Sequence, residues 1–238
     1  IAISINFLTY FYSDKIVLKM YKAKEADKKE YPKLHEIVRE VAMKAALPKP
    51  RVYIIDSDSS NAFATGRNPK NSSIAFTRGI LNLLDKNELK GVIAHEMAHI
   101  RNYDILVSTI AAVIAGAISY IALITRFGAA DREGNLFELI LLAILAPIIA
   151  LIIRMAISRS REYLADETGA KIIRNPNALA DALSKLNYSS QEKPLKFGNN
   201  ATSHLFIVNP FSGKSLINLF STHPPIAERI GRLRKINF

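Results

Sequence analysis

At residues 85–104 the chain reads DKNELKGVIAHEMAHIRNYD. Asp85 is followed three residues later by Glu88, which is the pattern of a capping box, in which each side chain satisfies a free backbone N–H at the start of a helix. Beyond this box the apolar residues recur with helical spacing, at Leu89, Ile93, Met97 and Ile100. The sequence therefore predicts a helix that begins after Asp85.

This predicted helix contains the motif HEMAH at residues 95–99. Two histidines four positions apart project from one face of a helix, so both imidazoles can bind one Zn²⁺ ion, and the glutamate between them can act as general base on a zinc-activated water. The motif thus predicts His95 and His99 as zinc ligands and Glu96 as the base. The structural alternative is a pair of helix-face histidines with hydrogen-bond partners inside the protein.

A catalytic zinc ion needs a third protein ligand and an open position for water. The segment SRSREYLAD, residues 158–166, places Glu162 and Asp166 four residues apart on one helical face. Glu162 would complete a ligand set of two histidines and one carboxylate, and Asp166 would accept a hydrogen bond from an imidazole. The alternative is a charged helix start in which Glu162 pairs with Arg159 or Arg161, and the spacing does not choose between the two.

The remaining histidines differ in their surroundings. His223 lies in STHPP, where two prolines hold the chain in an extended, rigid turn that would suit a hydrogen-bond donor to a developing oxyanion. The alternative for His223 is an ordinary surface turn. His35 and His204 have no supporting neighbours, which favours structural roles for both.

Two long apolar stretches separate the candidate ligands. Residues 105–125 carry no charge, and residues 136–157 carry charges only at Glu138 and Arg154. Each is long enough to cross a bilayer core of about 30 Å, so they predict a transmembrane helical hairpin with a short polar connector. The alternative is a pair of helices buried in a soluble core. Because a hairpin leaves and returns on one side, it would bring His99 and Glu162 to the same membrane face.

The charge distribution predicts the orientation. The chain has 32 basic and 21 acidic residues, a net charge of +11, and only Arg126 and Arg132 lie in the connector. Basic residues flank the stretches on the other side, at Lys15, Lys19, Lys22, Arg101, Arg154, Arg159 and Arg161. The positive-inside rule places this side in the cytoplasm of a multi-pass protein of the cell membrane. It also explains the net charge without a nucleic-acid partner, for which no aromatic and basic array is present.

The composition excludes several classes of protein. With 49% apolar residues the chain is not disordered, and with no cysteine it has no disulfide framework, cysteine zinc finger, iron–sulfur cluster or thiol nucleophile. A helix is expected over 31–46 and strands over 51–56 and 73–77, with turns and an apolar island at 62–64 between the strands. The expected fold is mostly α with a small antiparallel β-sheet (α+β).

The expected division of the chain follows from these elements. Residues 1–12 are apolar and begin with Ile, so we expect the end of a truncated membrane span there. Residues 13–104 and 158–238 would be the two halves of one cytoplasmic catalytic domain, interrupted by the hairpin at 105–157.

These segments resemble a known family. HEMAH followed by an apolar stretch, and REYLAD after a second one, are similar to the HtpX-type membrane zinc metalloproteases, relatives of the CAAX prenyl endopeptidases. The resemblance extends to the segments PKPRVYIIDSDSSNAFATGRNPKNSSIAFTRGILNLLDKNELKGVIAHEMAHIRNYD, NATSHLFIVNPFSG and STHPPIAERI. It covers nearly the whole chain from residue 13.

The resemblance implies a zincin-like catalytic domain with one Zn²⁺ per chain. It implies His95, His99 and Glu162 as ligands, Glu96 as base, and Asp166 as the partner of a ligand histidine. It also implies a substrate-binding edge at Asn61, Ala62, Phe63 and Ala64, along which an extended peptide adds as a strand. His223 and Arg229 occupy family positions associated with binding the transition state.

The function implied is that of a membrane-bound zinc metalloendopeptidase that clears misfolded or damaged membrane proteins. Its partners would be unfolded or membrane-protein polypeptides and the lipid bilayer. One alternative is processing of a specific prenylated or signal-derived peptide. An alternative of another class is a catalytically silent, zinc-containing membrane adaptor, against which the presence of Glu96 counts.

Overall fold

The computed structural model describes residues 14–108, 110, 136–195, 205–208 and 223–238. The expected membrane-span end at 1–12 and most of the stretch 105–125 lie outside these residues. His204 lies outside them as well.

A four-stranded sheet lies beside the helices. Its strands are β1 (Lys24–Glu25), β2 (Arg51–Ile55), β3 (Ala62–Asn68) and β4 (Asn71–Thr77), in the order β1-β2-β4-β3. β3 and β4 form an antiparallel hairpin, whereas β2 and β4 pair in parallel, with Tyr53 opposite Ala75. β3 is therefore an edge strand of this sheet.

The prediction of an antiparallel sheet is thus wrong for its central pair. The reason lies in residues 62–68, which we expected to form turns around a short apolar island but which form the full strand β3. Because the chain reverses between β2 and β3 and again between β3 and β4, β4 runs in the same direction as β2. The mixed α+β class of the prediction is confirmed.

Besides helical segments at 14–20 and 104–108, six helices pack on and around this sheet in the described part of the chain. They are α2 (Pro32–Lys44), α3 (Arg78–Leu83), α4 (Lys86–Arg101), α6 (Leu136–Ile173), α7 (Pro176–Glu192) and α8 (Ile226–Leu233). α4 begins with the predicted capping box, because Asp85 accepts from the Glu88 backbone and Glu88 accepts from the Asp85 backbone. The predicted helix over 31–46 is present as α2.

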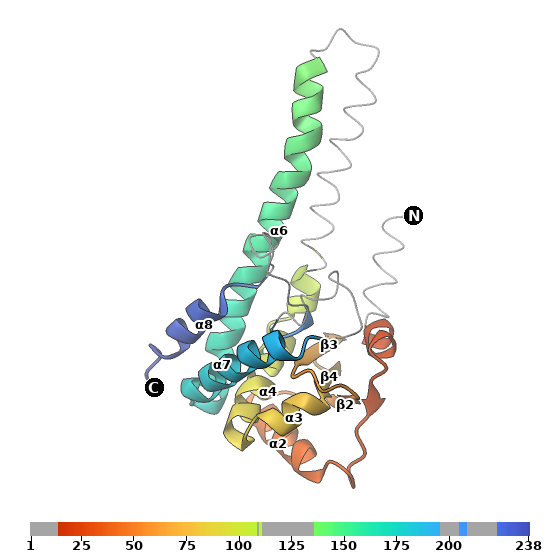
Figure 1. Ribbon diagram of the computed structural model, residues 1–238, viewed down its shortest axis with the longest axis vertical. Helices are drawn as coiled ribbons and strands as arrows, with labels where there is room; N and C mark the ends of the chain where they lie inside the picture. Colours follow the sequence, from red (N-terminus) through yellow and green to blue (C-terminus); the bar gives the residue numbers. More distant parts are fainter. Residues whose placement is uncertain (1–13, 109, 111–135, 196–204, 209–222) are drawn as a thin grey trace.

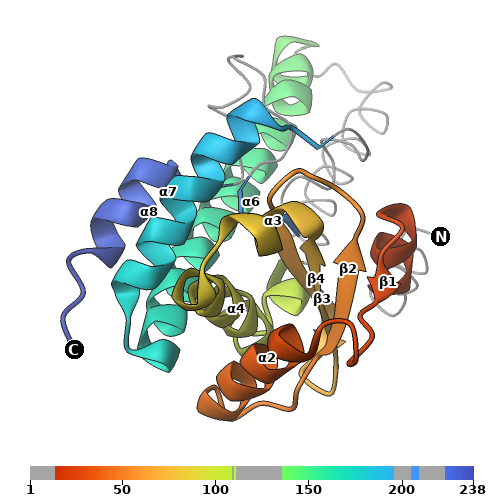
Figure 2. The ribbon, with the colours of Figure 1, turned by 60° about the horizontal axis from the view of Figure 1, so that its bottom comes forward.

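α4 is the central helix of the molecule. It contacts α2, β3, α6 and α7, and Figure 2 shows it between the sheet and the pair α6 and α7. The apolar core includes residues of α2, β2, β4, α4 and α7. Because α4 is enclosed on all sides, its polar residues His95 and Glu96 are buried together with its apolar ones.

α6 joins two segments that the sequence suggested separately. One continuous helix of 38 residues contains both the apolar stretch 136–157 and the segment with Glu162 and Asp166. In Figure 1 it runs from the top of the view down to the compact part of the molecule, where the other helices gather. Within the described residues, no helix meets the combined requirements of length and apolarity for crossing a membrane. The transmembrane hairpin therefore stays a prediction.

Candidate active site

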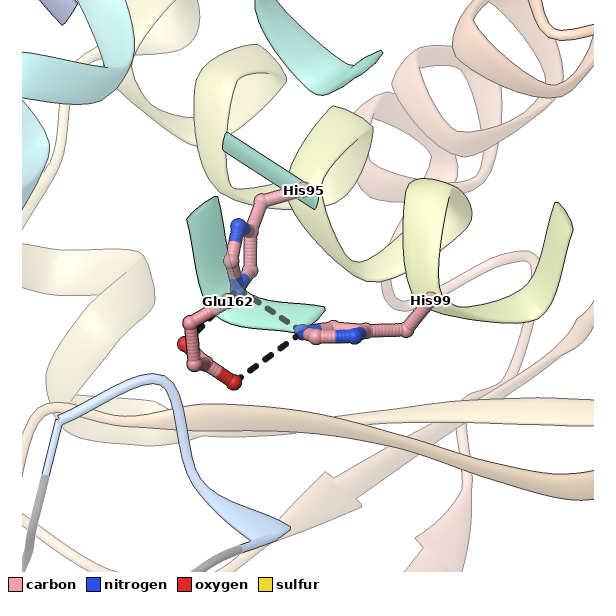
Figure 3. A group of neighbouring side chains, drawn as sticks. All are labelled: His95, His99 and Glu162. Carbon is pink, nitrogen blue, oxygen red and sulfur yellow. Dashed lines mark hydrogen bonds and ion pairs between the residues drawn. The ribbon is translucent and has the colours of Figure 1, made fainter. Parts of the chain in front are cut away.

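The two histidines of HEMAH face the same point in space. His95 is fully buried and the side chain of His99 is 19% exposed. Their Nε2 atoms lie 3.0 Å apart, and their rings are nearly perpendicular (Figure 3). The spacing of four residues on one helix produces this convergence, as the sequence predicted.

Glu162 of α6 adds a carboxylate to this pair. Its Oε1 lies 3.5 Å from Nε2 of His99, and its Oε2 lies 3.7 Å from Nε2 of His95. Figure 3 shows the three side chains converging from the two helices. α6 approaches α4 this closely because residue 169 is glycine: a Cβ there would lie 2.9 Å from the backbone nitrogen of His95.

The three side chains fit a metal ion. One ligand atom from each of His95, His99 and Glu162 lies within 4.8 Å of the other two. For a tetrahedral ion with metal–nitrogen bonds near 2.0 Å, two ligand atoms lie about 3.3 Å apart. The observed separations, 3.0 Å between the two histidine nitrogens and 3.5 and 3.7 Å from these nitrogens to the Glu162 oxygens, lie on either side of that value. The donor set of two imidazoles and one carboxylate is typical of catalytic zinc.

Each histidine is oriented by a carboxylate on its other nitrogen. Asp166 of α6 accepts a hydrogen bond from Nδ1 of His95 at 2.9 Å, and Asp104 accepts one from Nδ1 of His99 at 2.5 Å. A proton held on Nδ1 leaves the lone pair on Nε2 free for a metal. The prediction that Asp166 would contact an imidazole agrees with this arrangement. The equivalent contact of Asp104 was not anticipated.

An arginine lies behind each of these carboxylates. Arg229 of α8 is fully buried and donates to Asp166 from Nε and Nη2 at 2.8 and 2.7 Å. Its Nη1 also lies 3.0 Å from Oε2 of Glu162. Arg161 forms an ion pair with Asp104 and donates to the backbone carbonyl of Asn102. Because Arg161 pairs with Asp104 and Glu162 is buried, the exposed Glu162–Arg161 pair considered above is not formed.

The environment of Glu162 keeps it ionised. Burial alone would raise the pKa of Glu162, but the Arg229 guanidinium and His223 hold it well below its usual range. A negatively charged carboxylate is the form that binds a cation.

Glu96 is buried beside these candidate ligands, with 2% of its surface exposed. Burial raises the pKa of Glu96 to about 7, with a further contribution from Glu162 and an opposing one from His99. A backbone hydrogen bond from Ala64 of β3 favours its charged form. A carboxylate with a pKa near neutrality can both accept and return a proton at physiological pH.

His223 is inside the site and not in a surface turn. It is 8% exposed, and its Nδ1 lies 3.5 Å from Oε2 of Glu162. The structure also brings Arg229 to the site, through its contacts with Glu162 and Asp166. His35 is remote from it, and its Nε2 bonds to the backbone carbonyl of Ala26 at 2.9 Å.

The four residues of the expected substrate edge lie at the start of β3 and just before it. Ala62 and Ala64 face the core on the side of α4, whereas Phe63 belongs to a smaller cluster. Asn61 is fully buried and its side chain makes internal hydrogen bonds, to the carbonyl of Val208 and from the backbone N–H of Ala62. A small cleft lies between β3 and the end of α4, lined by Ala64 and His99 among others.

Comparison with known proteins agrees with this geometry. The family model described as "Peptidase family M48" matches residues 28–237. The chain belongs to the M48 peptidase family. The family is one of metalloproteases, and the structure supplies a place for one metal ion at His95, His99 and Glu162.

Curated relatives of the chain are proteases named as HtpX homologues. "Protease HtpX homolog" of Pyrococcus furiosus is 54% identical over 243 residues, which cover 99% of this chain and 84% of that protein. "Protease HtpX homolog" of Thermodesulfovibrio yellowstonii is 56% identical over 240 residues, which cover 98% of this chain and 85% of that protein. The resemblance to HtpX-type proteases is thereby confirmed, and the chain is a metalloendopeptidase.

A solved structure shares the fold. The crystal structure of S. mikatae Ste24p superposes with a TM-score of 0.64 at 18% sequence identity, covering 98% of this chain and 56% of that one. At this identity the match establishes the common fold.

Sequence reasoning missed three parts of this M48 site. Asp104 and Arg161 support His99, and the segment 205–208 lies against Asn61 and Arg229. A signal for Asp104 was present, because it lies five residues after His99, where the chain leaves α4. The segment 205–208 lies within NATSHLFIVNPFSG, which the family resemblance singled out without a role, and its contacts were not predictable because its partners are more than a hundred residues away or on another helix.

Proposed function

We propose that this protein is a membrane-bound zinc metalloendopeptidase that hydrolyses misfolded or damaged membrane proteins on the cytoplasmic side of the cell membrane. The observation that carries the proposal is the convergence of His95, His99 and Glu162 on one point, with Glu96 beside them and an edge strand within reach. One Zn²⁺ per chain fits this donor set.

His95, His99 and Glu162 would hold the zinc ion, which when bound polarises the scissile carbonyl and lowers the pKa of a water molecule. Glu96 accepts a proton from the attacking water and returns it to the leaving amine, a role suited to its pKa of about 7. β3 aligns the substrate by backbone hydrogen bonds.

His223 and Arg229 have different roles in this proposal. His223 lies beside Glu162 and donates a hydrogen bond to the developing oxyanion. Arg229 is fully buried and already bound by Asp166 and Glu162. Its guanidinium therefore positions these two carboxylates and does not contact the substrate.

The membrane location rests on the apolar stretches 105–125 and 136–157, which lie between the two halves of the site. The second stretch is the N-terminal part of α6, the helix that carries Glu162. The site would therefore lie close to the bilayer, where membrane proteins are the accessible substrates. Recognition through backbone bonds gives broad sequence specificity, which suits unfolded polypeptides.

The test is a paired measurement on the wild type and the Glu96→Gln variant in detergent. We expect one zinc per chain in both by elemental analysis, and cleavage of unfolded casein by the wild type alone. Glu162→Gln is the contrasting variant and should lose zinc. Zinc in both proteins with cleavage in neither would count against a broad endopeptidase and favour a processing protease or a silent adaptor.

A further inference from the structure

The segment 205–208, which we name the strap, lies along the outer side of β3. The backbone N–H of Ile207 donates to the carbonyl of Ala62 at 3.2 Å. The side-chain amide of Asn61 donates to the carbonyl of Val208 at 2.7 Å. Nη1 of Arg229 donates to the carbonyl of Ile207 at 3.0 Å. The strap is therefore bonded both to the sheet and to the arginine behind the metal site.

The side chains of the strap are anchored in the protein interior. Phe206 is 1% exposed and packs edge-on against the rings of Tyr21 and Phe63, with centroid distances of 5.0 and 5.2 Å. Ile207 and Val208 are also buried and belong to the main core. Because its residues enter two separate apolar clusters, the strap is a fixed part of the fold and not a displaceable cover.

The strap and Asn61 occupy the backbone groups at the N-terminal end of the free edge of β3. The carbonyl of Asn61 accepts a hydrogen bond from the backbone N–H of Thr77 in β4. In an antiparallel ladder every second residue directs its backbone groups away from the partner strand, so those of Ala62 and Ala64 point outward. The Ala62 carbonyl is bonded to the strap, and the Ala62 N–H is bonded to the Asn61 side chain. An incoming peptide therefore finds no free backbone group at Ala62.

The other end of the edge is limited by the irregularity of the strand. The register between β3 and β4 shifts between Thr65 and Asn68, and Gly66 has a φ of 126°. Such a bulge interrupts the regular ladder. Ala64 is then the residue whose backbone groups point outward in regular strand geometry. Its N–H bonds to Glu96, so a substrate would pair there through the Ala64 carbonyl.

We propose that the strap is a specificity determinant that confines sheet pairing of the substrate to Ala64 and stops it at Ala62. This inference rests on the proposed function. An extended peptide pairs more stably in the antiparallel direction, which points its C-terminal half toward the strap. Residues on that side of the scissile bond gain no backbone hydrogen bonds with β3 beyond Ala64.

The first test needs no variant. Cleavage sites of the wild-type zinc enzyme in unfolded casein are located by mass spectrometry, and peptides around one site are lengthened one residue at a time on either side. We expect kcat/KM to stop rising after the first or second residue on the C-terminal side. A plateau on the N-terminal side would reverse the direction of the peptide but still support the strap as a barrier. An equal rise on both sides, beyond several residues, would overturn the inference.

The second test removes the barrier. Ile207→Pro deletes the N–H that bonds to Ala62, and its ring takes the place of that hydrogen against the Ala62 carbonyl, so this part of the strap must shift away from β3. Ile207→Ala shortens the side chain and keeps the N–H. In the proline variant, the next residue on the plateau side should raise kcat/KM by about two- to tenfold, as expected for a net hydrogen bond, and the alanine variant should keep the plateau. Phe206→Ala loosens the strap from the opposite face and should act like the proline variant.

The outcomes separate three explanations. If Ile207→Pro raised kcat/KM equally for peptides of every length, the strap would be a displaceable inhibitor, and our inference would be wrong. An unchanged plateau in both Ile207→Pro and Phe206→Ala, with zinc retained, would also overturn it. If the wild type cleaved no polypeptide while Glu96→Gln and wild type both held zinc, the proposed function would fail, and the inference would fall with it.

Discussion

The two histidines of the site are held by the same chemistry in two unlike regions of the molecule. His95 is fully buried, and its supports, Asp166 and Arg229, come from α6 and α8, with Arg229 134 positions away along the chain. His99 is partly exposed, and Asp104 supports it from only five positions away. Each histidine thus has a carboxylate and then an arginine behind it. Both supports of His95 come from distant elements, whereas His99 has a local carboxylate and only its arginine, Arg161 of α6, is distant.

The difference is visible in the acid–base properties of the two rings. Burial, with the neighbouring His99, lowers the pKa of His95 below its usual value. Burial also acts to lower the pKa of His99, but Asp104 and the carboxylates of Glu162 and Glu96 together raise it to about 9. A fully desolvated set therefore depends on every partner being present, whereas a set near solvent tolerates more change.

The largest effect is expected from removing the deepest arginine. Arg229→Met leaves the buried carboxylates of Asp166 and Glu162 without their cation, which should cost about 3–5 kcal/mol of stability. The matched variant Arg161→Met removes a cation whose side chain is 21% exposed and should cost clearly less. Urea denaturation of the metal-free proteins in detergent measures both. Equal losses would remove the distinction between the two regions.

A smaller effect is expected where the two helices touch. In Gly169→Ala the new Cβ would lie 2.9 Å from the backbone nitrogen of His95, so α6 must move away from α4. We expect a loss of about 1–3 kcal/mol together with weaker zinc retention, because Glu162 and Asp166 move with α6. Gly231→Ala is the control, since nothing lies within 4 Å of its added Cβ. Full zinc affinity in Gly169→Ala would show that the helices are free to adjust.

How far the sequence predicts this site follows the same division between local and distant contacts. The capping box at Asp85 and the spacing of HEMAH predicted α4 and the convergence of its two histidines, because helix geometry alone fixes which side chains share a face. The spacing of Glu162 and Asp166 predicted that these two act together, but not whether Glu162 would face the metal site or an arginine. The close packing of α6 on α4 at Gly169 determines that Glu162 faces the two histidines.

The contacts that sequence reasoning missed depend on the tertiary fold. The parallel pairing of β2 with β4 depends on the formation of β3 between them. The sequence of residues 62–68 combines an apolar island with turn-forming residues, so it did not predict a strand. The strap is hydrogen-bonded to Asn61 and Ala62. Asn61 and its partner Val208 are 147 positions apart in the chain, and no periodicity in the sequence indicates such a contact. Asp104 lies near His99 in the chain, but its distance of five residues does not match the helical spacing that identified Asp166.

The carboxylates themselves should show a finer difference. Asp166→Asn and Asp104→Asn each replace a charged hydrogen-bond acceptor on Nδ1 of a ligand histidine, and such changes typically weaken metal binding by about 10–100-fold. We expect Asp166→Asn near the upper end, because its position is buried with a fully buried arginine, and Asp104→Asn near the lower end. Competition with a zinc chelator at fixed pH gives both affinities. If Asp104→Asn weakened zinc binding more than Asp166→Asn, proximity of the acceptor in the sequence would matter more than its burial.

The smallest effect is expected from a change that keeps the charge at the shallow site. Arg161 pairs with Asp104 and at the same time donates to the backbone carbonyl of Asn102, which a planar guanidinium with several donors can do. Arg161→Lys keeps the ion pair but gives up this second contact, so zinc affinity should fall only a few-fold. Arg229→Lys is the matched change at the deep site, where the guanidinium makes four contacts with Asp166, Ile207 and Glu162, and its loss should be larger by at least tenfold. If both lysine variants bound zinc equally well, charge alone would hold the two histidines, and the difference in depth would have no consequence for the metal.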